Sequence, residues 1–280
     1  MPSLRYDITV NHQTPTTACD ALVRHTKMSK TYIKKAMIKG AVWLSRAAKK
    51  PHRLRRATSR VRPGDRLVFY YNSEILMQKA PQAQCLNDFK RYSIWYKPAG
   101  LMTQGTRYGD HVSLCRQVEQ RFKQKRKVYL VHRLDRETIG VCILAHDHNA
   151  ATLFSDLFRK HHIEKHYRAW VLGHLITEKT YDLIDLPLDG KTAQTQFRSL
   201  RYDSHRNQTL IDVKILTGRY HQIRRHLDML GHPVMGDPRY GRKNKTASGL
   251  RLMAYCLYFK CPYRHDYFKA KIDPKSLGFA

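Results

Sequence analysis

Acidic residues are scarce in this sequence, and long apolar runs are absent from it. Its 280 residues include 22 Asp and Glu against 52 Lys and Arg, a formal net charge of +30. The longest apolar stretches, such as 67–71 and 141–145, are far shorter than the roughly 20 residues of a membrane-spanning helix. Residues 1–10 hold no apolar segment of the kind that forms a signal peptide. We therefore expect neither a membrane protein nor a secreted one.

Cysteine is also sparse, and its spacing argues against two kinds of site. Six cysteines are scattered along the chain without any Cys-x-x-Cys pair. This pattern is typical of reduced thiols in a cytoplasmic protein, not of a disulfide framework or a zinc site. The sequence has neither metal-ligand spacing nor a phosphate loop, so it predicts no metal and no cofactor. Without a heptad pattern or an exposed apolar face, we expect a monomer.

Positive charge is what the sequence has in excess. Hydrophobic residues make up 42% of the chain, which is enough for a packed core. The charge therefore predicts a polyanionic partner, and nucleic acid is the first candidate, because Lys and Arg neutralise phosphates and release counterions. An anionic membrane surface is the competing partner, but no basic amphipathic helix with a bulky apolar face is present. Residues 1–70 carry 16 basic and three acidic residues, nearly half of the surplus in a quarter of the chain.

Residues 1–72 are predicted to form a small α+β module. Thr17 and Ser29 are placed to cap helices over 18–25 and 30–39, and Gly40 follows the second helix where a C-terminal glycine is usual. Short strands are predicted over 41–44 and 66–71.

The second of these helices is predicted to bind RNA. Its apolar residues are interspersed with Lys30, Lys34 and Lys35, so one face packs and the other is cationic. The alternative is a basic surface that only aids solubility.

Residues 73–87 are interpreted as a linker, 88–270 as a second domain and 271–280 as a tail. The predicted strands of this domain are 91–96, 141–145, 167–172, 194–200, 209–216 and 252–260. Its predicted helices are 112–122, 148–160 and 221–230. Strands outnumber helices and do not alternate with them regularly. The expected fold class is therefore α+β with a mixed or antiparallel sheet, not a doubly wound sheet.

One candidate for chemistry is a charged segment that runs into a core strand. Asp135 lies among His132, Arg133 and Arg136, directly before the apolar strand 141–145. These cations would favour the ionised form of the carboxylate, which can then act as a nucleophile or a base. The alternative is a structural ion pair at the junction of a loop and a strand.

A second candidate follows a tight turn at Gly218. Arg219, His221, Gln222 and Arg224 are predicted to project near the start of the helix over 221–230. This arrangement suits phosphate contacts and pairing with a buried carboxylate. A basic surface helix is the alternative.

Two further segments indicate ordinary structure when taken alone. Residues 95–100 end an apolar strand and enter a Lys-Pro turn, which fits edge packing. Tyr167 enters a strand, where core packing is the usual role of tyrosine.

Taken together, these segments resemble the RluA-type family of pseudouridine synthases. The matching runs come in order at 96–100, 132–135, 165–167 and 218–224, and the resemblance covers roughly residues 90–260. It implies a pseudouridine synthase fold whose catalytic carboxylate is Asp135. Three routes stay open for that carboxylate: attack on the anomeric carbon of the ribose, attack on the base, or removal of a ribose proton.

The resemblance also assigns roles to the other residues. Arg224 is the ion-pair partner of Asp135, and Tyr167 stacks on the flipped base and helps to move a proton. Arg133 fills the gap that the flipped base leaves. The remaining expected contacts to RNA or to the loop that holds it are His132, Arg219, His221 and Gln222. The reaction is an isomerisation that needs no redox step, metal or cofactor, and the target uridine must leave its stack to be reached.

The N-terminal module resembles the alpha-L type of RNA-binding module named after a small-subunit ribosomal protein. The resemblance rests on the runs 29–31, 38–42 and 61–65. Such a module favours a large structured RNA, so ribosomal RNA is preferred over transfer RNA.

Two positions depart from the family pattern. Ile139 stands where the family usually has Ser, and Met253 stands where it often has His. Ile139 is the main feature in favour of an inactive RNA-binding or ribosome-assembly protein. A DNA-binding protein is the other alternative, although the sequence has no recognition-helix pattern.

Overall fold

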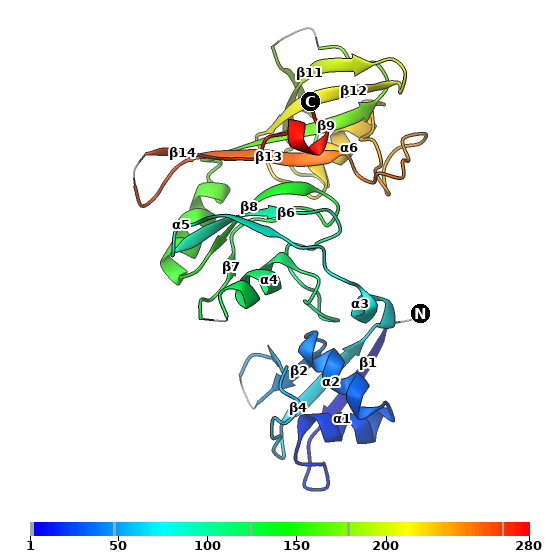
Figure 1. Ribbon diagram of the computed structural model, residues 1–280, viewed down its shortest axis with the longest axis vertical. Coiled ribbons are helices and arrows are strands. Elements are labelled where there is room, and N and C mark those ends of the chain that lie inside the picture. The colour runs from blue at the N-terminus through cyan, green and yellow to red at the C-terminus, as the bar shows by residue number, and fades with distance from the viewer. Residues whose placement is uncertain (1–2, 47–48, 124, 178–179, 265) are drawn as a thin grey trace. The chain divides into compact units, whose positions relative to one another are not determined.

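The structure, a computed structural model, describes residues 3–46, 49–123, 125–177, 180–264 and 266–280 and divides the chain into two units (Figure 1). The first unit comprises Met1–Ala80 and Gln104–Gln117, and the second comprises Pro81–Thr103 and Val118–Ala280. The segment 104–117 thus belongs with the first unit, although it lies inside the predicted second domain. Among the described residues, no helix is long and apolar enough to span a membrane.

The first unit combines a four-stranded sheet with the helices α1 (Ala18–Thr26), α2 (Lys30–Ile38) and α3 (Ser73–Met77). Its strands are β1 (Leu4–Thr9), β2 (Val42–Ser45), β3 (His52–Arg53) and β4 (Arg66–Tyr71). The strand order is β1-β4-β2-β3, and all pairs are antiparallel. The predicted caps are confirmed, because the side chain of Thr17 accepts from the N–H of Asp20 and that of Ser29 from the N–H of Tyr32.

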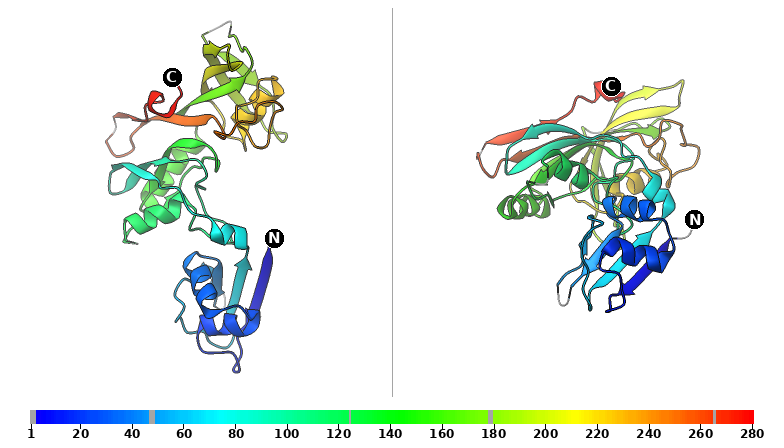
Figure 2. Two further views of the ribbon diagram at one scale, coloured as in Figure 1. Left: turned by 45° about the vertical axis from the view of Figure 1, so that its right-hand side comes forward. Right: turned by 60° about the horizontal axis from the view of Figure 1, so that its bottom comes forward.

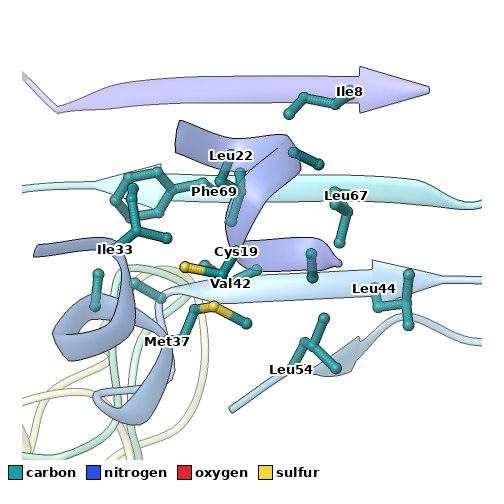
Figure 3. Close-up of a cluster of buried hydrophobic side chains, with 14 of the residues drawn as sticks. Ile8, Cys19, Leu22, Ile33, Met37, Val42, Leu44, Leu54, Leu67 and Phe69 are labelled. Carbon is teal, nitrogen blue, oxygen red and sulfur yellow. The ribbon is translucent and has the colours of Figure 1, made fainter. Parts of the chain in front are cut away.

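The core of the first unit explains why α2 has one cationic face. Ile33 and Met37 point into a buried cluster with residues of α1, β2 and β4 (Figure 3). Lys30, Lys34 and Lys35 are exposed. Lys30 forms an ion pair with Asp20.

The segment 104–117 is held to the rest of the first unit by arginines of the basic loop, residues 49–62. Arg53 and Arg55 both pair with the Asp110 carboxylate, and Arg53 also donates to the Thr106 carbonyl. Gly40 has a positive φ of 80°, and a Cβ atom there would lie 2.5 Å from Asp110 Oδ1. Two of the cations in the basic loop are therefore committed to a protein contact.

The second unit is built on a ten-stranded mixed sheet. Its strands are β5 (Gln84–Asp88), β6 (Tyr92–Lys97), β7 (Tyr129–Leu130), β8 (Ile139–Ala145), β9 (Ile163–Leu172), β10 (Asp182–Asp185), β11 (Gln194–Asp203), β12 (Gln208–Ile215), β13 (Leu252–Lys260) and β14 (Tyr267–Lys271). The main path runs β10-β11-β12-β9-β13-β8-β6-β5, with β14 on β13 and β7 on β8. Among the strand pairs of the described residues, only β13–β8 is parallel. The predicted α+β class with a mixed sheet is confirmed.

Two helices in the described part of the second unit pack on this sheet, α5 (His148–Arg159) on β7 and β8 and α6 (Gln222–Met229) on β11. The helix α4 (Leu114–Arg121) spans the boundary between the units, and a short 3-10 helix, η1 (Lys275–Leu277), lies near the C-terminus. Both views of Figure 2 show α5 beside β6 and β8. There Phe154 packs against Tyr92, Val141 and Ile143 in a buried cluster.

Two sequence interpretations are wrong. The expected linker 73–87 contains α3 and most of β5, which pairs with β6 and so extends the sheet. The expected tail 271–280 carries Phe279, which is 2% exposed in a cluster with Trp170 and Met253. The indole N–H of Trp170 also donates to the Gly278 carbonyl.

Candidate active site

The second unit contains a cavity of about 690 Å³ that joins three of the segments singled out in the sequence. The loop 131–138, the segment 155–167 and the turn 218–224 all contribute to its lining. This volume lies within the usual range for small-ligand sites, about 300–1,000 Å³, which is enough for a nucleotide.

Asp135 occupies the loop between β7 and β8 and faces two residues from the start of α6. Its Oδ2 lies 3.2 Å from Nη1 of Arg224 and 3.5 Å from Nε2 of His221. The side chain of Asp135 is 23% exposed, whereas that of Arg224 is 4% exposed. The carboxylate thus reaches the cavity while its cationic partner stays fixed behind it.

The backbone on both sides of Asp135 is held by two side chains that precede it in the sequence. Thr103 donates to the carbonyl of Leu134 at 2.7 Å and accepts from its N–H at 3.1 Å. Lys97, fully buried, donates to the Arg136 carbonyl at 3.0 Å and to those of Pro98 and Leu101. Burial lowers the pKa of Lys97 to about 8.

Sequence reasoning missed both of these residues, since the Lys-Pro segment was interpreted as edge packing. The available signal was a lysine at the end of an apolar strand, where a buried ammonium group needs acceptors. Three carbonyls supply them here.

Arg224 is itself held by a second carboxylate, Asp237. Its Nε and Nη2 donate to the two Asp237 oxygens at 2.6 and 2.8 Å. Asp237 is fully buried and also accepts from the backbone N–H groups of Arg239 and Tyr240. Burial acts to raise the pKa of Asp237, but these hydrogen bonds together outweigh it and hold the pKa below its usual range. Sequence reasoning placed Gly236-Asp237 in a turn and within the family resemblance, but it gave Asp237 no role.

His221 begins α6 in the left-handed conformation, with a φ of 52°. Its Nδ1 lies 3.1 Å from the Tyr240 hydroxyl, and its ring stacks on that of Tyr220 at 3.8 Å. Burial lowers its pKa, which the Asp135 charge only partly offsets. A neutral ring with Nε2–H toward the Asp135 carboxylate and Nδ1 accepting from Tyr240 satisfies both contacts.

Tyr167 lies on β9, where it is 8% exposed and lines the cavity. Burial raises the pKa of its phenol, and the neighbouring Cys142 and Asp135 add to the shift. The hydroxyl therefore keeps its proton and presents a donor beside an aromatic face.

The expected RNA contacts of the second unit divide into two groups. Arg133 and Arg219 are exposed and line the cavity, with the Arg219 Nε donating to the Thr192 carbonyl. Gln222, by contrast, is 3% exposed. Its amide hydrogen-bonds only to protein groups, namely Thr217, Arg219, Gln194 and Thr195.

Gln222 was expected to hold the RNA backbone or the loop; its amide joins the turn before α6 to β11, and a contact with RNA stays a prediction. His132 also points to the protein: its Nε2 accepts from the Ile143 N–H at 2.9 Å, and its ring stacks on Phe158. Burial lowers the pKa of His132 to about 3, so the ring is neutral. The expected cationic contribution of His132 to the site is therefore wrong.

The two departures from the family pattern are neighbours in space. Ile139 and Met253 are register partners in the parallel pairing of β8 with β13, and both belong to the apolar cluster around Trp170. Gly140, the next residue, has a φ of 133°, and a Cβ atom there would lie 2.0 Å from the Ala254 carbonyl oxygen. The close approach of these strands requires glycine.

Comparison with known proteins gives consistent matches. Residues 91–229 match the family described as RNA pseudouridylate synthase. An uncharacterized RNA pseudouridine synthase of Aquifex aeolicus is 28% identical over 253 residues, which cover 81% of this chain and 78% of that protein. The dual-specificity RNA pseudouridine synthase RluA of Escherichia coli is 32% identical over 175 residues, which cover 57% of this chain and 77% of that protein.

A solved structure supports the fold. The human protein titled RNA Pseudouridylate Synthase Domain Containing 1 matches with a TM-score of 0.59 at 22% identity, covering 71% of this chain and 87% of that one.

Proposed function

Since the chain belongs to the RluA-type family of RNA pseudouridine synthases, which are isomerases acting on RNA, we propose that Asp135 acts on the target uridine and that the target lies in structured RNA, chiefly ribosomal. The observation that carries the assignment is the Asp135 carboxylate at the cavity, 3.2 Å from a buried arginine. We also propose that the protein is a monomer and that it works in the cytoplasm.

The reaction exchanges one bond of the uridine for another. The bond between C1′ of the ribose and N1 of the base breaks, and C1′ then bonds to C5. The C5 hydrogen leaves as a proton and N1 takes up a proton, so atoms and electrons balance. For Asp135 the three routes named above remain: attack on C1′, attack on the base, or removal of a ribose proton.

The neighbouring residues prepare the cavity for a flipped base. The buried ring of Tyr167 offers a face on which the uracil stacks, and its protonated hydroxyl can donate. Arg133, exposed at the cavity, fills the gap left in the RNA stack. Arg224 orients Asp135 and favours its ionised form, because it is itself held by Asp237.

The test is pseudouridine mapping on total RNA from cells with and without this gene, complemented by the wild type or by Asp135→Asn. We expect loss of pseudouridine at a defined ribosomal uridine, restored by the wild type alone. Restoration by Asp135→Asn would refute the role of Asp135. Loss at a transfer-RNA site instead would replace the ribosomal target, and no lost site would favour an inactive RNA-binding protein.

We further propose that the first unit is an RNA-binding module of the alpha-L type. The capped helix α2 presents Lys34 and Lys35 to solvent on the face opposite its packed side. This positive surface suits the phosphates of a large RNA. Dual specificity in the Escherichia coli relative shows that the family alone does not fix the RNA class.

The double variant Lys34→Glu/Lys35→Glu tests the module. It leaves in place Arg53 and Arg55, which pair with Asp110 of the segment 104–117. We expect weaker binding to the mapped RNA and an unchanged rate of isomerisation at saturating RNA. Equal affinity for the variant and the wild type would refute the module's role.

A further inference from the structure

Lys165 is a buried lysine of the cavity that has no hydrogen-bonding or ionic partner within the described part of the chain. It is 9% exposed and lines the cavity. It lies on the central strand β9, between Ile215 of β12 and Leu257 of β13. Side chains alternate along a strand, so Lys165 shares the inward face of β9 with Tyr167.

A cation in this position is costly. An ammonium group taken out of water without a counter-charge loses hydration that the protein does not replace. Burial alone lowers the pKa of Lys165 to about 8, from an ordinary value of 10.5. At pH 7 the group is still mostly protonated, so the cavity holds an uncompensated positive charge. Groups held in this way are typical of functional sites.

Among the described residues that line the cavity, none offers Lys165 a free carboxylate. Asp135 is the only carboxylate among the described lining residues, and it already pairs with Arg224. Burial lowers the pKa of both His132 and His161, and the charge of Lys165 lowers each pKa further. Arg133, also at the cavity, adds positive charge.

We propose that Lys165 binds a phosphate group of the RNA backbone beside the target uridine. The inference rests on the proposed function, because the target nucleotide must enter the cavity for its backbone to reach β9. A phosphate brings the missing negative charge, and an ammonium group binds it as a point charge. One strand then holds two parts of the substrate, the base at Tyr167 and the backbone at Lys165.

Two lysines, Lys165 and Lys97, have pKa values of about 8, and Lys165→Arg separates their contributions because it leaves Lys97 in place. Three histidines line the cavity, and all have pKa values below the ordinary one: His132, His161 and His221. The other titratable or charged side chains that line the cavity are Asp135, Tyr167 and Tyr220, with the arginines Arg133, Arg159, Arg219 and Arg224.

The experiment measures binding of the full chain to a fluorescent ten-residue oligouridylate by anisotropy, over a series of NaCl concentrations at pH 7. Lys165→Met keeps the length of the side chain and removes its charge, and Lys165→Arg keeps the charge. We expect Lys165→Met to raise Kd about 10- to 150-fold, the loss of one charged hydrogen bond. The slope of log K against log salt should fall by about 0.7, one contact to a single strand. Lys165→Arg should retain the affinity and the salt slope of the wild type.

A matched control is Lys214→Met. Lys214 lies on β12 and pairs with Glu164 at 3.0 Å, outside the residues that line the cavity. We expect its removal to leave the salt slope unchanged. All variants are compared by melting temperature, and Lys165→Met should be at least as stable as the wild type, because it removes a buried charge.

A second measurement uses pH. With a pKa of about 8, the protonated fraction of Lys165 falls about fourfold between pH 7 and 8.5, so the Kd of the wild type should rise about fourfold. In Lys165→Arg the rise in Kd should be smaller than in the wild type, because only Lys97 then keeps a pKa near 8.

Unchanged affinity and salt slope in Lys165→Met would overturn the proposal. So would a variant that binds normally but isomerises the mapped RNA slowly, because Lys165 would then act on the reacting base. A wild-type chain that binds the decamer, responds to these substitutions and forms no pseudouridine would instead refute the proposed function alone. A chain that binds no RNA would refute both.

Discussion

The replacement Asp237→Asn tests the support behind the candidate catalytic residue. The substitution keeps the shape of the side chain and one oxygen, which can still accept from the N–H groups of Arg239 and Tyr240. The new amide nitrogen then faces Nε of Arg224, where the carboxylate oxygen stood at 2.6 Å. Two donors meet at that distance, and a guanidinium group that is 4% exposed loses its main counter-charge.

Breaking a buried ion pair in this way costs about 3–5 kcal/mol. The second unit has about 190 residues, and for that size 1 kcal/mol corresponds to about 2–4 °C in melting temperature. We therefore expect Asp237→Asn to melt about 6–20 °C lower in calorimetry and to lose isomerisation of the mapped RNA. A melting temperature within 2 °C of the wild type would refute the reasoning.

The double replacement Arg224→Met/Asp237→Leu separates stability from activity. It removes both charges, and an apolar pair of similar volume is often as stable as the buried ion pair it replaces. We expect most of the lost melting temperature to return while isomerisation stays absent, because Asp135 then lacks the buried cation that orients its carboxylate. An active double variant would show that Arg224 is not needed for that purpose.

Three further predictions concern single side chains. Gly140→Ala should lower the melting temperature and abolish isomerisation, because the new Cβ atom meets the Ala254 carbonyl oxygen at 2.0 Å. Tyr220 is 54% exposed and lines the cavity. Tyr220→Ala should weaken binding of the oligouridylate about 5- to 150-fold by removing one base–aromatic stack, whereas Tyr220→Phe should bind normally. Equal losses of affinity in the two variants would argue against stacking. Phe279→Ala should cost about 3 kcal/mol in urea unfolding, since its ring is 2% exposed; a loss below 1 kcal/mol would show that the C-terminal segment does not stabilise the unit.

The sequence predicted the parts of this fold that have strong local patterns. Thr17 and Ser29 cap the two helices that follow them, and β8 is a continuous apolar run. Each of these signals lies within a few residues of the element that it predicts. Strand β5 was missed because every one of its residues is exposed, so its only signal is its pairing with β6. The position of β5 is set by its partner strand, and the residues of β5 alone carry no pattern that predicts this pairing.

The same distinction applies to the site. The pairing of Asp135 with Arg224 was expected from the order of motifs, and the structure places the two residues 3.2 Å apart. The supports were not predicted, because Lys97, Thr103 and Asp237 act through backbone carbonyls and buried hydrogen bonds whose partners are distant in sequence. The cationic role expected for His132 failed because its ring is stacked and neutral.

The pairing of Ile139 with Met253 means that the two departures from the family pattern are not independent of each other. They are register partners in one apolar cluster, so each is the packing environment of the other. A serine restored at 139 alone would bring its hydroxyl against a thioether, and a histidine restored at 253 alone would bring its ring against an aliphatic side chain. Free energies of neighbouring substitutions are not additive. The effects of Ile139→Ser and Met253→His on the free energy of unfolding are therefore coupled. Either substitution made alone lowers stability, and adding the second recovers part of the loss.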